Sequence, residues 1–110
     1  MKNMDFKDIE EELKIFLKER GWIDFSPNDV FIHLIEELGE IGKHLLFQSK
    51  YKTENMGHKR PPQDQLSREF GQSFSLFLQW AIILGVNLEE SWKNEFEIMK
   101  KRFPLTDKIK

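Results

Sequence analysis

The segment from Phe74 to Leu84 most constrains how this chain can fold, because it is apolar on nearly every side of a helix. It lies near the end of a helix that we expect to run from about Asp64 to Leu84. A helix of this kind must be covered on more than one side. In a chain of 110 residues a second copy would supply part of that cover, so we expect a homodimer or a homotetramer.

Three more helices are predicted around this one, and residues that start or stop helices mark their ends. The four expected ranges are about 5–21, 26–48, 64–84 and 87–104. Gly21 stops the first helix, Ser26 and Pro27 suit the cap and first position of the second, and Asn87 with Glu90 has the spacing of a capping box. No strand-like alternation competes. The sequence therefore predicts one domain over residues 1–110, an all-α four-helix bundle completed by oligomerisation.

Apolar stripes predict which helix faces are buried. In the second helix, Leu34, Leu38, Ile41 and Leu45 recur at helical spacing and predict its core side. The corresponding stripe of the last helix is Leu88, Trp92, Phe96, Met99 and Phe103. The aromatic connector after the first helix, from Trp22 to Phe25, is expected to pack beneath the bundle.

Composition excludes several classes of function. The formal net charge of −2 argues against a general electrostatic grip on nucleic acid or on an anionic membrane. Cysteine is absent, so disulfides, thiolate nucleophiles and cysteine zinc sites are excluded, and oxygen atoms are the expected metal ligands. The longest apolar zone, Phe74 to Val86, is too short to span a bilayer, and the first residues lack a signal core. We expect a cytoplasmic protein.

Three carboxylates on the second helix form the clearest candidate site. Glu37 and Glu40 are three residues apart and share a helix face, Glu36 precedes them, and His33 and His44 lie one turn outward on either side. Carboxylate oxygens are the ligands that magnesium prefers. The alternative is an ordinary solvated face, since glutamate is a strong helix former.

The long connection from Ser49 to Gln63 is a second candidate element. It is rich in basic residues, Lys59 and Arg60 among them, and loops of this length are often functional lids. These two side chains could contact the phosphates of a ligand. A solvated basic linker explains the same composition.

The chain from about Asp29 to Pro104 resembles the MazG-like nucleotide pyrophosphohydrolases, an all-α family. That family carries a Glu-Glu-x-x-Glu run on one helix and a Glu-x-x-Asp run on the next. The first run is intact here as Glu36, Glu37 and Glu40, whereas the second reads Glu69-Phe70-Gly71-Gln72. Two further segments also match the family's sequence pattern: Leu84-Gly85-Val86-Asn87-Leu88 and Arg102-Phe103-Pro104.

The resemblance implies a magnesium site, in which manganese could also bind, and hydrolysis of a nucleoside triphosphate or related nucleotide to the monophosphate and pyrophosphate. The implied metal ligands are Glu37, Glu40, Glu69 and Gln72. Glu36 and Glu37 are the implied catalytic carboxylates, which orient or deprotonate the attacking water. Lys59, Arg60 and Arg102 are the expected substrate-binding residues.

Three departures from the family pattern open a second hypothesis. Gln72 replaces an aspartate, which removes one negative charge from the expected metal site. Glu95 and Met99 stand where the family often has a lysine and an asparagine. The chain is therefore predicted either to be an enzyme with weakened activity or to be a catalytically impaired nucleotide-binding or protein-interaction oligomer. A purely structural helical oligomer would leave the matched acids on two helices unexplained.

Overall fold

The computed structural model describes residues 4–105, and this part of the chain is helical with no strand. Its α-helices are α1 (Phe6–Glu19), α2 (Pro27–Gln48), α3 (Leu66–Ile83) and α4 (Leu88–Arg102). Three short 3-10 helices join them: η1 (Trp22–Asp24), η2 (Glu54–Met56) and η3 (Gln63–Gln65). The predicted all-α class is confirmed, and the four helices lie where the sequence placed them. The first three and last five positions of the predicted domain lie outside the described residues.

Local sequence explains where the helices begin and end. The Ser26 hydroxyl accepts a hydrogen bond from the Asn28 amide at 3.2 Å, and Pro27 occupies the first turn of α2. The Asn87 side chain accepts from the Glu90 amide at 3.1 Å and caps α4. Gly21, with φ of 72°, takes the left-handed conformation that ends α1. These ends agree with the prediction.

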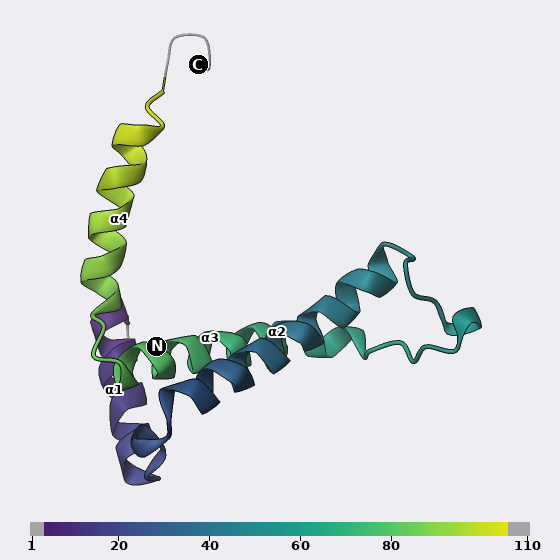
Figure 1. Cartoon of the computed structure of the whole chain (residues 1–110), viewed down its shortest axis with the longest axis horizontal. Helices are drawn as coiled ribbons and strands as arrows, with labels where there is room; N and C mark the ends of the chain where they lie inside the picture. Colours follow the sequence, from purple (N-terminus) through teal and green to yellow (C-terminus); the bar gives the residue numbers. More distant parts are fainter. Residues whose placement is uncertain (1–3, 106–110) are drawn as a thin grey trace.

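The helices α2 and α3 lie side by side and form an elongated arm (Figure 1). Val30 and Leu34 of α2 pack with Leu76 of α3 at the centre of the buried cluster. At the base of the arm α1 packs against α3, and its Leu17 is buried almost completely. The loop between α2 and α3 lies at the opposite tip (Figure 1).

The buried face of α2 differs from the predicted one. Leu34 and Ile41 are buried as expected, but Leu38 and Leu45 are 47% and 54% exposed. The face that meets α3 includes His44, which is 4% exposed. Because each residue turns the helix by about 100°, this face is rotated away from Leu38 and Leu45. The apolar spacing therefore predicted the burial of Leu38 and Leu45 wrongly and did not predict that of His44.

Helix α4 turns away from the arm. The segment Gln63–Ile83 and α4 meet at an angle of 101°, and none of the residues of α4 is buried. Figure 1 shows α4 projecting beyond the other helices. The chain has a radius of gyration of 18.4 Å, whereas a compact domain of this length has about 13 Å. Completion of the bundle by other subunits stays a prediction.

The loop at the tip of the arm extends beyond the end of α2 and contacts that end through Arg60 (Figure 1). Its η2 and η3 turns were not predicted from the sequence. The Arg60 guanidinium lies 3.2 Å from a carboxylate oxygen of Glu54 and 5.1 Å from the centre of the Phe47 ring. In residues 4–105, no single helix has both the length and the apolar character needed to cross a membrane.

Candidate functional site

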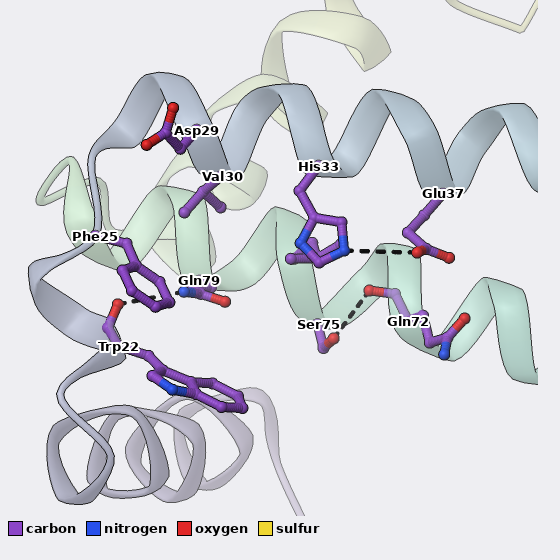
Figure 2. A pocket seen from close by; sticks show the side chains of 10 residues that line it. Trp22, Phe25, Asp29, Val30, His33, Glu37, Gln72, Ser75 and Gln79 are labelled. Atoms are coloured by element: carbon purple, nitrogen blue, oxygen red, sulfur yellow. Dashed lines mark hydrogen bonds and ion pairs between the residues drawn. The ribbon is translucent and has the colours of Figure 1, made fainter.

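A cavity of about 550 Å³ lies between α2 and α3 at the base of the arm, next to η1 (Figure 2). Its volume is within the usual range for small-molecule sites, about 300 to 1,000 Å³. The lining residues come from all three elements and their connector: Trp22, Phe25, Asp29, Val30, His33, Glu37, Gln72, Ser75, Leu76 and Gln79. We call it the α2–α3 cavity.

Two aromatic rings form one wall of the α2–α3 cavity. The rings of Trp22 and Phe25 are stacked, with centroids 6.3 Å apart and planes 19° apart. The side-chain amide of Gln79 donates a hydrogen bond to the Trp22 carbonyl at 3.3 Å and fixes η1 to α3. Trp22 and Phe25 are 42% and 50% exposed, so they are not packed beneath the bundle as predicted. They are fixed at the edge of a cavity, with part of each ring accessible.

The α2 side of the cavity is acidic. Glu37 and His33 are one helical turn apart, and a Glu37 carboxylate oxygen lies 3.6 Å from His33 Nε2. Asp29 lines the same side, one turn earlier. The Glu37 side chain is 20% exposed and lines the cavity, and Figure 2 shows its carboxylate beside the His33 ring. Glu37 therefore combines restricted solvation with access to a ligand.

The α3 side of the cavity carries Gln72 and Ser75. The Ser75 hydroxyl donates a hydrogen bond to the main-chain carbonyl of Gln72 at 2.9 Å. The side-chain amide of Gln72 takes no part in this hydrogen bond. Figure 2 shows Glu37 and Gln72 on facing helices at the same end of the cavity. One residue from each of the two sequence motifs thus lines a single cavity, although 34 positions of sequence separate them.

Glu69 has a different environment from the one predicted. One of its carboxylate oxygens, Oε2, lies 3.0 Å from His44 Nε2, and the two side chains are only 12% and 4% exposed. Neither of these atoms makes a well-aligned hydrogen bond within residues 4–105. Glu69 does not line the α2–α3 cavity. The α2–α3 contact therefore contains a buried acid–imidazole pair. Each side chain is the nearest polar partner of the other.

The remaining acids of the first motif face outward. A Glu40 oxygen lies 3.2 Å from the Lys43 ammonium, and Glu36 is exposed. Across the described residues, no three His, Cys, Asp or Glu side chains are grouped so that they could hold a metal ion. The expected convergence of Glu37, Glu40 and Glu69 on one cation is absent from this arrangement. The donors present do not fit a magnesium site, since only Glu37 and Gln72 of the four expected ligands line the cavity.

The expected substrate-binding residues lie away from the α2–α3 cavity. Lys59 lines a separate hollow of about 220 Å³ at the tip of the arm, with Lys43 and Lys52. Arg60 is paired with Glu54 in the loop, and Arg102 ends α4. None of the three lines the cavity within one chain.

Several site residues were not predicted from the sequence. Asp29, Ser75 and Gln79 line the cavity, and His44, which the sequence placed beside the candidate carboxylates, is instead the buried partner of Glu69. Gln79 did give a signal, because it is a polar residue inside the apolar zone from Phe74 to Leu84. Such a residue needs a hydrogen-bond partner when buried, and it finds one in the carbonyl of Trp22.

Comparison with known proteins finds a distant relative. The chain is 28% identical over 109 residues to the uncharacterized protein YvdC of Bacillus subtilis (strain 168). The match covers 91% of this chain and 97% of that protein, so the two are alike along nearly their whole lengths. No protein-family model and no solved structure matches.

Proposed function

We propose that the α2–α3 cavity binds a nucleotide and that the chain is a MazG-like nucleotide pyrophosphohydrolase with weakened activity. The observation that carries this proposal is the presence of Glu37 and Gln72 in one cavity. They belong to the two motifs on which the resemblance rests. A structural role alone gives no reason for both to line an open space.

The other walls of the cavity suit the parts of a nucleotide. A base can stack on the exposed portion of the Trp22 and Phe25 rings, since aromatic pairs favour offset stacking. The amides of Gln72 and Gln79 offer donors and acceptors to the polar edge of a base or to a sugar hydroxyl. Specificity would come from these few polar groups within a largely apolar site.

Glu37 is the proposed general base. Its carboxylate is the member of the first motif that lines the cavity, and His33 Nε2 lies 3.6 Å from it. In the proposed reaction, water attacks the α-phosphorus, its proton passes to Glu37, and pyrophosphate leaves. Asp29 and Glu37 are acidic, so they would repel the phosphates of a nucleotide that carries no counter-ion.

A second candidate function is nucleotide binding without turnover. It is favoured by the side-chain contacts that occupy Glu69 and Glu40, with the His44 imidazole and the Lys43 ammonium respectively. For a four-ligand magnesium site to form, both glutamates would have to leave these partners. Separating Glu69 from His44 would cost free energy, because each buried polar group would lose its partner.

A nucleotide panel with Mg²⁺ or Mn²⁺ distinguishes the two functions. Pyrophosphate release is measured for the natural chain and for Glu37→Gln, and nucleotide binding is measured by calorimetry. The enzyme proposal predicts slow release that falls at least about hundredfold in Glu37→Gln, within the usual range for loss of a general base. Binding without release supports the second function, and absence of both contradicts both functions.

Gln72→Asp sharpens the test. It adds a carboxylate to the cavity beside Glu37, so Mg²⁺ affinity and any pyrophosphate release are expected to rise together. Gln63→Asp is the matched control, because it is the same chemical change at an exposed position outside the cavity. Equal metal affinity and equal activity in both variants would show that residue 72 does not face a bound cation.

A further inference from the structure

Gln79 lines the α2–α3 cavity with a side chain whose orientation is fixed. The residue is only 7% exposed, and its Nε2 atom lies 3.3 Å from the main-chain carbonyl oxygen of Trp22. A carbonyl oxygen can only accept a hydrogen bond, so the amide must present its N–H group to Trp22 and its own oxygen, Oε1, elsewhere. Figure 2 shows Oε1 pointing away from the Trp22 carbonyl.

The Oε1 atom of Gln79 is an acceptor without a donor in the protein. Among residues 4–105, the hydrogen bond made by this side chain is the one that Nε2 donates. The oxygen is not sealed inside the protein, so a ligand can reach it from the cavity. An acceptor on a nearly buried side chain costs free energy when it is unpaired, so a ligand that supplies an N–H group there is favoured.

The α2 side of the cavity also presents acceptors. Asp29 and Glu37 line it with carboxylates, and no lysine or arginine of residues 4–105 lines the cavity. An amino group has two N–H bonds, so it can donate to an acceptor on each of the two facing helices. A keto base supplies a single ring N–H instead, and this N–H lies beside a carbonyl oxygen that the carboxylates would repel.

We infer that the α2–α3 cavity selects nucleobases that carry an exocyclic amino group, and that Gln79 is the specificity-determining residue. The inference rests on the proposed function, because it takes the ligand to be a nucleotide whose base stacks on Trp22 and Phe25. The amino group donates to Oε1 of Gln79, while Nε2 keeps its hydrogen bond to the Trp22 carbonyl. One side chain therefore holds the aromatic wall in place and recognises the base that stacks on it.

Matched pairs of nucleosides test this selectivity without phosphate or metal. Adenosine is compared with purine riboside, and cytidine is compared with pyrimidinone riboside, so that the members of each pair differ only by the amino group. Calorimetry with the full chain should show about ten- to hundredfold tighter binding of the amino member, because the other member leaves the Gln79 acceptor unpaired.

The outcomes separate this inference from the proposed function. Equal affinity within both pairs overturns the inference and leaves the proposed function standing, as does binding of nucleotides but of no nucleoside. Absence of binding by every nucleoside and every nucleotide of the panel overturns both.

Two substitutions of Gln79 distinguish recognition from a purely structural role. Gln79→Met removes the acceptor, so the affinity ratio within each pair should fall at least about fivefold. Loss of the link to Trp22 alone would weaken both members equally, and an unchanged ratio in this variant overturns the inference. Gln79→Glu keeps an acceptor oxygen, so its ratio should persist. Gln63→Met is the matched control, because Gln63 is exposed and outside the cavity, and circular dichroism checks that each variant is folded.

Discussion

The buried pair of His44 and Glu69 gives the sharpest prediction for stability. His44→Leu would leave the Glu69 carboxylate without its partner in a site where it is only 12% exposed. Breaking one side of a buried pair costs about 3 to 5 kcal/mol, and we expect about 3 kcal/mol because Glu69 keeps some contact with water. For a domain of this size the melting temperature should fall by roughly 10 to 20 °C.

The paired substitution separates the loss of the polar partner from the loss of packing. His44→Leu with Glu69→Leu removes both polar groups, so the unfolding free energy should return to within about 1 kcal/mol of the natural chain. Urea unfolding followed by circular dichroism measures each free energy. The titrations are run at several protein concentrations, because self-association raises apparent stability.

His33→Leu is the matched control for this experiment. The His33–Glu37 pair has the same chemistry, but His33 is 57% exposed, so its loss should cost less than about 1 kcal/mol. The reasoning is refuted if His44→Leu costs no more than His33→Leu. It is also refuted if the costs of His44→Leu and Glu69→Leu simply add in the double variant, since contacting residues should be coupled.

Two further predictions concern the core and the connection to α4, and both are measured by urea unfolding. Leu78→Ala should lower the unfolding free energy by about 2 to 5 kcal/mol, because Leu78 is 1% exposed and its loss leaves a cavity. Gly85→Ala should cost about 1 kcal/mol through backbone strain alone, since Gly85 has φ of 74° and no atom within 4 Å of the added methyl group. Gly39→Ala, inside α2 and equally free of contacts, should instead stabilise the chain by about 0.5 to 1 kcal/mol.

Helix positions could be predicted from the sequence because their signals are local. Ser26, Pro27 and Asn87 act on backbone groups two or three residues away, so the amino-acid order determines their effect. The packing partners of each helix depend on residues far along the chain. Periodicity therefore identified the stripe of α4, but it could not indicate that this helix would turn away from α3 at Gly85.

The candidate site was predictable only in part, for a related reason. Glu37 and Gln72 could be paired through the resemblance, and both do line one cavity. The direction of Glu69 depends on His44, a residue whose burial is decided by how α2 is rotated against α3. A shift of the contact face by less than one residue moved His44 inside and Leu38 outside. Helical spacing does not resolve so small a rotation.

The hydrogen bond between Gln79 and the Trp22 carbonyl links the first helix to the site. It joins the connector after α1, which carries the aromatic wall of the cavity, to α3. A ligand held against Trp22 consequently favours the docked position of α1, and anything that releases Leu17 from its buried position lowers ligand affinity by the same factor. Resistance of the connector to proteolysis should therefore rise with ligand concentration. The stability of α1 docking would then depend on ligand binding, although no residue of α1 lines the cavity.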